Sequence, residues 1–297
     1  MRVSRHARSM AVVLLGVAAC GGARDAPTFG GTDSPAVSAT PEIASLERAM
    51  HARLNRDRAK QGLAPLAFDA KLASVGRAHS EDMRTHRFFA HESPQTGALE
   101  DRLDRAGYLA GVARENLGEG PTVDGTQDAL LRSPGHHANI MAKDVTHVGI
   151  GIVKGGVGAP ENILVTQVFA TPIVPTDPAQ AAEAVARTIQ QTRRGAGLKP
   201  LPRHPKLDAL AREHVNEVAD DLDPSSATAV GTKVKSALSG SGFRGIVVET
   251  SLFLAPEMFE AKGAVLQAQA RSVGIAAAPA HDKRGRPAIK VLLIVGI

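Results

Sequence analysis

Apolar residues recur at helical spacing in the stretch that follows Thr40-Pro41. The recurring residues are Leu46, Met50 and Leu54. This spacing places them on one face of a helix. A threonine followed by proline is typical of a helix start, and Gly62 is typical of a helix end. The pattern therefore predicts a helix from about Pro41 to Gly62.

A second helical pattern runs from about Asp69 to His86, and two shorter ones cover residues 122–132 and 134–141. Ser133 precedes the last of these and is expected to cap it. The apolar face of the second helix carries Leu72, Val75, His79 and Met83. A histidine on such a face is expected to be buried and hydrogen-bonded in a structural role.

Two β-branched, apolar runs follow the helices, at residues 148–154 and 162–170. A glycine-rich segment joins them, so the pattern predicts a β-hairpin. Helices come first and strands come later, which predicts an α+β domain.

The chain repeats itself at a shift of 135 positions. Of the 22 residues from Gly62, eight are identical to those from Gly197, without a gap. Val148-Gly149-Ile150 meets Val273-Gly274-Ile275 at a shift of 125, so the second copy is shorter. Three prolines lie at the junction of the copies, within residues 172–178. We interpret this as a duplicated domain, with copies at residues 42–174 and 178–297.

The first twenty residues are typical of an export signal. Arginines come first, and an uncharged apolar run from Met10 to Ala19 follows, too short to span a bilayer. Val17-Ala18-Ala19-Cys20 resembles the site at which bacteria cleave and lipidate a cysteine. Cys20 is the only cysteine in the chain, which favours lipidation over an ordinary secretory signal. We expect a signal peptide at residues 1–19 and a membrane attachment through lipid on Cys20.

Residues 20–41 are rich in Gly, Pro, Ser, Thr and Ala, and this composition predicts a flexible tether. The formal net charge of the whole chain is +5, and the predicted signal holds three of the arginines. The basic character is therefore partly a property of the export signal. With no Trp and one Tyr, the chain also lacks stacking platforms for bases, so we expect no nucleic-acid partner.

Three short stretches carry ionisable side chains that could do chemistry. They are residues 88–94, 115–117 and 133–140, and each is expected beside a turn or a helix start. Two imidazoles and a carboxylate could ligate a divalent metal, or the carboxylate could orient a histidine as general base. The alternative is that these residues only hold turns and helix ends in shape.

The order of motifs resembles bacterial CAP domains, the fold of the cysteine-rich secretory, antigen 5 and pathogenesis-related (SCP-like) proteins. The resemblance covers about residues 42–172. It rests on the following segments, in this order: His79-Ser80-Glu81-Asp82-Met83, Phe88-Phe89-Ala90-His91-Glu92-Ser93-Pro94, Asp101-Arg102-Leu103, Ala106-Gly107-Tyr108, Glu115-Asn116-Leu117, Ser133-Pro134-Gly135-His136-His137-Ala138-Asn139-Ile140, Val148-Gly149-Ile150-Gly151 and Thr166-Gln167-Val168-Phe169.

This resemblance implies a three-layer α-β-α sandwich with a central cleft. In the cleft His91 and His136 would face each other, with Glu115 between them. Animal and plant members add a second acid that helps to hold a divalent cation such as zinc, and Ser133 takes its place here. Three ligands could still hold a metal, but more weakly.

The second copy lacks most of this set. Ser226 stands where His91 is expected, and only Glu249 could correspond to Glu115. We therefore expect a degenerate CAP-like domain that packs against, or binds, a partner.

Three functions fit the sequence. The first is an extracytoplasmic cell-envelope lipoprotein whose His/Glu-lined cleft binds a lipid, a cell-wall fragment or another protein. The second is a hydrolase that uses His91 or His136 with Glu115, with or without a metal-activated water. The third is a purely structural role in the envelope. No nucleotide-binding, serine-hydrolase or zinc-protease motif is present to add another class.

Overall fold

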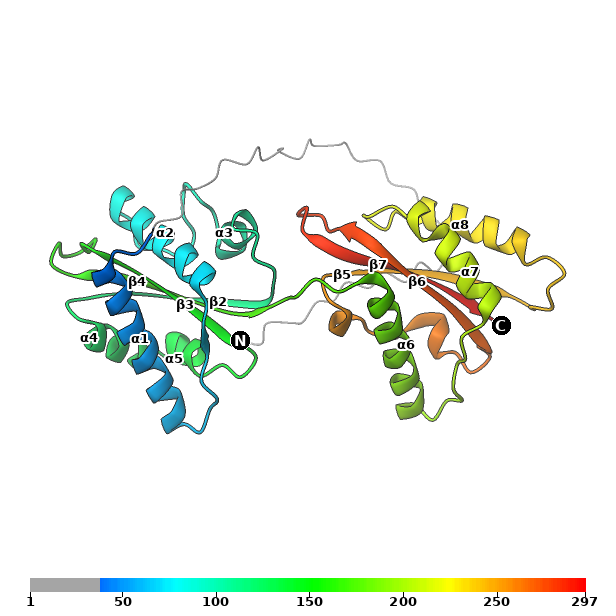
Figure 1. Cartoon of the computed structure of the whole chain (residues 1–297), viewed down its shortest axis with the longest axis horizontal. Helices are drawn as coiled ribbons and strands as arrows, with labels where there is room; N and C mark the ends of the chain where they lie inside the picture. Colours follow the sequence, from blue (N-terminus) through cyan, green and yellow to red (C-terminus); the bar gives the residue numbers. More distant parts are fainter. Residues whose placement is uncertain (1–37) are drawn as a thin grey trace. The chain divides into compact units, whose positions relative to one another are not determined.

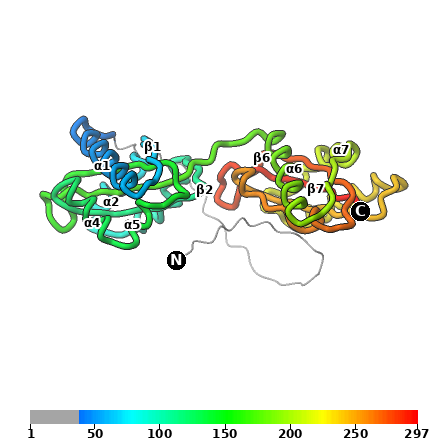
Figure 2. The backbone as a smooth tube through the Cα atoms, turned by 90° about the horizontal axis from the view of Figure 1, so that it is seen from below, coloured from blue at the N-terminus to red at the C-terminus, as the bar shows by residue number. Residues whose placement is uncertain are grey.

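The computed structural model describes residues 38–297, which form two compact units, residues 38–173 and 174–297 (Figure 1). Figure 2 shows the stretch of backbone after the first unit that leads into the second. The predicted signal peptide, Cys20 and most of the predicted tether lie outside the described residues. Within the described range, no helix combines the length and the apolar character that crossing a membrane requires.

The first unit contains five helices and four strands in its described residues. In chain order they are α1 (Pro41–Lys60), β1 (Ala67–Phe68), α2 (Ala70–His86), α3 (Leu99–Arg105), β2 (Ala110–Gly120), α4 (Val123–Arg132), α5 (Pro134–Ile140), β3 (His147–Lys154) and β4 (Ile163–Pro172). The sheet order is β1-β3-β4-β2, with β1 parallel to β3 and the other neighbours antiparallel.

Helices cover both faces of this sheet, so the unit is an α-β-α sandwich (Figure 1). On one face, α1, α4 and α5 bury a core that includes Met50, Leu130 and Ile140. On the other face, α2 and α3 bury a core that includes Leu72 and Leu103. The predicted α+β class and three-layer architecture are confirmed.

Local sequence accounts for the helix ends. The Thr40 hydroxyl accepts the Ile43 N–H at 3.3 Å, and the Asp69 carboxylate accepts the N–H groups of Lys71 and Leu72. The predicted helices and the hairpin are confirmed within a few residues. One detail was wrong: Ser133 precedes α5 but makes no side-chain capping bond.

Two glycines of β3 set the distance between the sheet and α2. A Cβ built on Gly151 would lie 1.9 Å from the Arg77 nitrogen, and one on Gly149 would lie 2.1 Å from the Ala73 nitrogen. Both neighbours are backbone atoms of α2, so no side-chain rotation could make room. The sheet and the helix therefore touch backbone to backbone.

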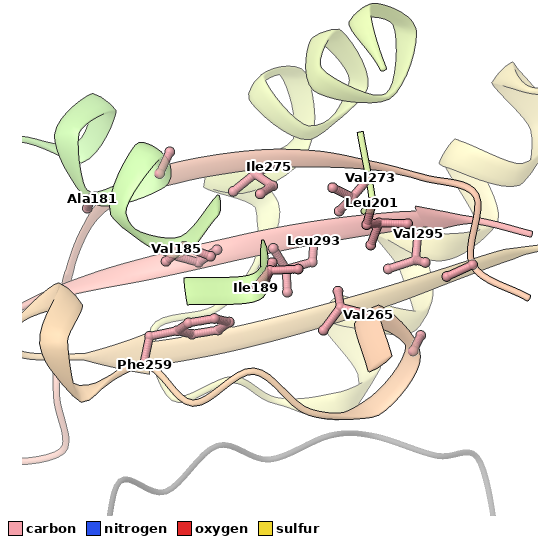
Figure 3. Close-up of a cluster of buried hydrophobic side chains, with 14 of the residues drawn as sticks. Ala181, Val185, Ile189, Leu201, Phe259, Val265, Val273, Ile275, Leu293 and Val295 are labelled. Atoms are coloured by element: carbon pink, nitrogen blue, oxygen red, sulfur yellow. The ribbon is translucent and has the colours of Figure 1, made fainter. Parts of the chain in front are cut away.

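The second unit has the same kind of layering around a smaller sheet. Its elements are α6 (Pro178–Gly195), α7 (Pro205–His214), η1 (Val215–Glu217), α8 (Pro224–Ala237), β5 (Ile246–Phe253), η2 (Pro256–Met258), η3 (Gly263–Leu266), β6 (Ser272–His281) and β7 (Pro287–Gly296). The strand order is β5-β7-β6, all antiparallel. Figure 3 shows Val185 and Ile189 of α6 packed on Leu293 and Val295 of the sheet. Helices α7 and α8 pack on the opposite face.

The first helix of each unit carries a buried arginine with matching contacts. Arg58 Nε donates to the Ala64 carbonyl at 2.9 Å, and its Nη1 donates to two carbonyls at the end of α5, those of Ile140 and Ala142. Arg193, 135 positions later, contacts the carbonyls of Lys199, Val265 and Gln267 in the same way. Each arginine ties its helix to a segment distant in sequence.

Candidate functional site

Glu115 lies in the middle of β2, on the edge of the sheet. The sequence pattern placed it beside a turn, and this was wrong. Residues 110–120 contain three glycines and three charged residues, a composition that is poor in strand formers and hides the strand. Its carboxylate is therefore held by a pleated, hydrogen-bonded backbone rather than by a loop.

Both oxygens of the Glu115 carboxylate are occupied. Oε1 lies 2.9 Å from His91 Nδ1, and Oε2 accepts a hydrogen bond from Arg102 Nη2 at 2.6 Å. The side chains of Glu115 and Arg102 are 4% and 5% exposed, whereas that of His91 is 59% exposed. A buried ion pair thus anchors a histidine that reaches into solvent.

This arrangement fixes the orientation of His91. A carboxylate that binds an arginine only accepts hydrogen bonds, so the His91 Nδ1 must be the donor. When the imidazole is neutral, its lone pair is then on Nε2, the atom turned away from Glu115. His91 can therefore accept a proton or a hydrogen bond from a molecule in the solvent-facing part of the site.

His136 and Ser133 line a pocket of about 360 Å³ beside β2. The pocket combines residues from β2, from α4, from the α4–α5 junction and from the segment after α2. Its lining residues are Phe89, Leu117, Gly118, Glu119, Thr126, Ala129, Leu130, Ser133 and His136. Because α2 and α4 lie on opposite faces of the sheet, residues from both sides of the sheet line the pocket at the β2 edge.

The His136 side chain makes no hydrogen bond within the described part of the chain, and its backbone carbonyl accepts one from Asn116. Burial, and after it the charge of His91, lower the pKa of His136 below its ordinary value. The imidazole is therefore held largely neutral at pH 7. The two histidines are close enough to interact electrostatically, but of the two only His91 is hydrogen-bonded to Glu115.

A family model of the cysteine-rich secretory proteins (CAP) matches residues 51–169. This segment runs from α1 to β4 and includes every residue of the site described above. Residues 51–169 belong to the CAP family. The first unit is hereafter called the CAP domain.

Similar proteins include two from Bacillus subtilis. The uncharacterized protein YkwD is 33% identical over 135 residues, which cover 45% of this chain and 52% of YkwD. The uncharacterized membrane protein YlbC is 38% identical over 97 residues, 32% of this chain and 28% of YlbC. The chain thus spans about half, or less, of the length of these curated relatives.

Solved structures that match part of the chain include an extracellular protein containing an SCP domain from Bacillus anthracis. It is 27% identical with a TM-score of 0.40, covering 45% of this chain and 44% of that one. An outer surface protein from Borrelia burgdorferi is 20% identical with a TM-score of 0.39, covering 46% of this chain and 96% of that one.

The CAP resemblance implied a divalent cation held by His91, His136 and Glu115, and the residues as placed do not fit one. Among the described residues, no group of three or more His, Cys, Asp or Glu side chains is arranged to hold a metal. Glu115 already gives both oxygens to His91 and to Arg102. The fixed positive charge of the guanidinium would also repel a cation.

Zinc titration checks this point directly. We expect the chain from residue 38 onward and its His91→Ala/His136→Ala variant to bind zinc with equal, weak affinity, because Arg102 already supplies the positive charge at Glu115. Isothermal titration calorimetry measures both. A stoichiometric site in the native chain that the double variant loses would contradict the expectation.

Arg102, Phe89 and Glu119 belong to the site, and the sequence did not assign them to it. From the sequence, Arg102 is only part of the motif Asp101-Arg102-Leu103 and has no assigned role. Nothing in the sequence indicates that its side chain, on α3, bonds to Glu115 of β2. Glu119 and Phe89 each lie a few residues from a predicted site residue, and β-strand periodicity would have placed Glu119 on the same face as Glu115.

His79 is buried, as its helix position predicts. It is 1% exposed, its Nε2 lies 3.0 Å from the Ala90 carbonyl, and its ring packs near Phe88. Three buried nitrogens at this place lack a hydrogen-bond partner within residues 38–297. They are Nδ1 of His79 and Nε and Nη1 of Arg102. His79 therefore supports the segment that leads to His91 rather than facing the pocket.

Acid is expected to destabilise the CAP domain through His79. Burial, and after it the charge of Arg102, lower the pKa of His79 from 6.5 to about 4. Between these values the unfolded chain binds a proton that the folded chain does not, so stability falls as the pH falls through this window. The full loss is about 3 kcal/mol. Urea unfolding at pH 7 and pH 4 should show a smaller acid loss in His79→Gln, and an equal loss would refute the assignment.

In the second unit, Glu249, the residue expected to match Glu115, is enclosed. Glu249 lies on β5, and its Oε1 accepts the Ala264 N–H at 2.6 Å. Burial raises the pKa of Glu249, and the hydrogen bond from Ala264 only partly offsets this. The neighbouring cavity measures about 10 Å³, room for one water molecule at most. Glu249 therefore holds the η3 segment and orients no histidine.

Proposed function

We propose that this protein binds a ligand in the cleft of its CAP domain, as an exported module attached to the cell envelope. The observation that carries the proposal is the open pocket beside the anchored pair of His91 and Glu115. Burying the ion pair of Glu115 and Arg102 costs desolvation free energy. Folding alone does not require this cost, because the imidazole that the pair orients is exposed. A ligand that contacts His91 and His136 gives the arrangement a use.

The mixed lining of the pocket favours a short, polar cell-wall fragment over an acyl chain. Ser133, Thr126, His136 and Glu119 offer hydrogen-bonding groups among apolar side chains. A long acyl chain gains little from such groups and leaves them without partners, which costs free energy. A cell-wall fragment, with amide and hydroxyl groups, satisfies them.

A binding experiment with matched histidine variants tests the proposal. A muramidase digest of peptidoglycan is titrated into the chain from residue 38 onward, and the backbone amide resonances of the pocket residues are followed by NMR. We expect His91→Ala/His136→Ala to weaken binding at least tenfold, and His137→Ala, which changes a histidine outside the pocket lining, to leave it unchanged. Equal binding by all three proteins would refute the cleft as the binding site.

A hydrolase is the second candidate, and the bond between His91 and Glu115 favours it. A carboxylate that holds Nδ1 leaves Nε2 free to take a proton from water. If the digest is cleaved as well as bound, the rate should disappear in His91→Ala. Binding without cleavage supports the binding module.

Attachment to the membrane through lipid on Cys20 belongs to the same proposal. Its support is the N-terminal pattern of arginines, apolar run and single cysteine. Labelled palmitate should enter the native protein and not Cys20→Ser. Incorporation into both would exclude this anchor.

We also infer that residues 178–297 are a degenerate copy of the CAP domain, kept for packing or for a partner. The support is the pair of matching arginine contacts, at Arg58 and Arg193, together with the repeat at a shift of 135. The purely structural alternative for the whole protein predicts that no ligand shifts His136 at all.

A further inference from the structure

Strand β2 is an edge strand of the CAP-domain sheet. It pairs with β4 along one side, and no strand pairs with its other side in the described residues. In an antiparallel ladder, main-chain groups point alternately towards the partner strand and away from it. Every second residue of β2 therefore turns its N–H and C=O outward.

Asn139 shows which residues these are. It lies on α5, outside the sheet, and its Nδ2 donates to the Glu115 carbonyl at 3.1 Å. The Glu115 main chain thus faces away from β4. With a period of two, Leu117 and Glu119 face the same way.

The pairing of β3 with β4 independently shows which residues of β2 face away from β4. Gly155 donates to the Asn162 carbonyl at 2.8 Å across the turn between β3 and β4. Two residues further along β4, Leu164 therefore directs its main-chain groups to β3. Leu164 is the residue opposite Glu119, so it cannot bond the Glu119 backbone.

Leu117 and Glu119, whose main-chain groups point outward, both line the pocket. Their N–H and C=O groups have no hydrogen-bond partner within residues 38–297. Leu117 is only 4% exposed. Buried main-chain groups are nearly always hydrogen-bonded in proteins. The N–H and C=O groups of Leu117 and Glu119 are therefore available to a ligand, spaced as alternate residues of a strand.

The charges in the pocket narrow the choice of ligand. Glu119 and His136 are its ionisable lining residues, and no Lys or Arg lines it. Burial acts to raise the pKa of Glu119, but hydrogen bonds from Asn162, Gly158 and Ala159 outweigh it and lower the pKa. The pocket is therefore negative, and an acidic ligand is disfavoured.

We propose that the outer edge of β2 binds the main chain of an extended peptide, neutral or basic in its side chains, as an added strand. The proposal rests on the proposed ligand-binding function and names its ligand class. Leu117 and Glu119 exchange main-chain hydrogen bonds with the peptide, Phe89 and Leu130 contact its side chains, and Glu119 attracts a basic one. Addition of a strand to a sheet edge is a general mode of peptide recognition.

The probe is the peptide acetyl-Ala-Lys-Ala-Ala-amide, compared with an analogue methylated on alternate amide nitrogens. Methylation removes the main-chain donors and keeps the side chains and the charge. Hydrogen exchange of individual amides is followed by NMR in the chain from residue 38 onward. We expect the peptide to slow exchange at Leu117 and Glu119 at least tenfold, and the methylated analogue to bind at least tenfold more weakly.

Asn116 and Gly118 are the internal control, because their amides face β4 and are already paired. Their exchange should not change. Equal binding of peptide and analogue, no binding, or no slowing at Leu117 and Glu119 would overturn the inference. If the cell-wall digest still shifts His136 in that case, the cleft binds a different chemical group and the proposed function stands. If neither probe shifts His136, both fail.

Discussion

Replacing Gly151 by alanine is expected to destabilise the CAP domain by about 3 kcal/mol or more. The added methyl group would lie 1.9 Å from the Arg77 nitrogen and 2.2 Å from the Gly76 carbonyl carbon. Since both are backbone atoms of α2, the whole helix must shift. The helix is also held by a buried ion pair between Arg77 and Glu47, at 2.9 Å, which resists such a shift.

Tyr108 gives this measurement a clean signal. The chain has no Trp, and Tyr108 is its only tyrosine, so its fluorescence reports on the CAP domain alone. Urea unfolding followed by this fluorescence should shift to lower urea in Gly151→Ala. Gly135→Ala is the control, because nothing lies within 4 Å of the added methyl, and its midpoint should stay within error. Equal midpoints for both variants would show that α2 can retreat from the sheet at little cost.

Replacing either buried arginine by methionine is expected to unfold one unit and spare the other. Arg58 is 2% exposed and Arg193 is 1% exposed, and each donates three hydrogen bonds to backbone carbonyls. Methionine keeps much of the volume but leaves these carbonyls without donors. The expected loss is about 3 to 5 kcal/mol in each case.

Two spectroscopic signals distinguish the unfolding of one unit from that of the other. Arg58→Met should lower the urea midpoint seen by Tyr108 fluorescence, whereas Arg193→Met should leave it unchanged and lower a second transition seen by circular dichroism. Arg56→Met, an exposed change on the same helix as Arg58, should move neither by more than about 0.5 kcal/mol. A shift of the Tyr108 signal by Arg193→Met would mean that the two units unfold together.

The helices of the CAP domain and its hairpin could be predicted because their apolar spacing is regular and their ends carry Thr, Asp, Pro and Gly. Strand β2 could not, because Gly111, Gly118 and Gly120 and its charged residues obscure the alternation. The pocket depends on this strand being at the sheet edge, and strand order is set by contacts between segments distant in sequence. The pairing of Arg102 with Glu115 is also a tertiary contact, so residue type alone suggested a metal ligand where the structure has an ion pair.

Because the second unit is closed around Glu249, it can be compared with the first unit as a related unit without an open pocket at this position. It keeps the arginine anchor at Arg193 and the close backbone approach at Gly274, whose Cβ would lie 2.2 Å from the Leu207 carbonyl carbon. Ser226 stands 135 positions after His91, and Ala237 stands 135 positions after Arg102. On the duplication inferred above, residues shared by the two halves are assigned to folding, and residues confined to the first half are assigned to the proposed binding cleft. By that criterion His79, matched by His214, serves the fold, and Arg102 serves the cleft.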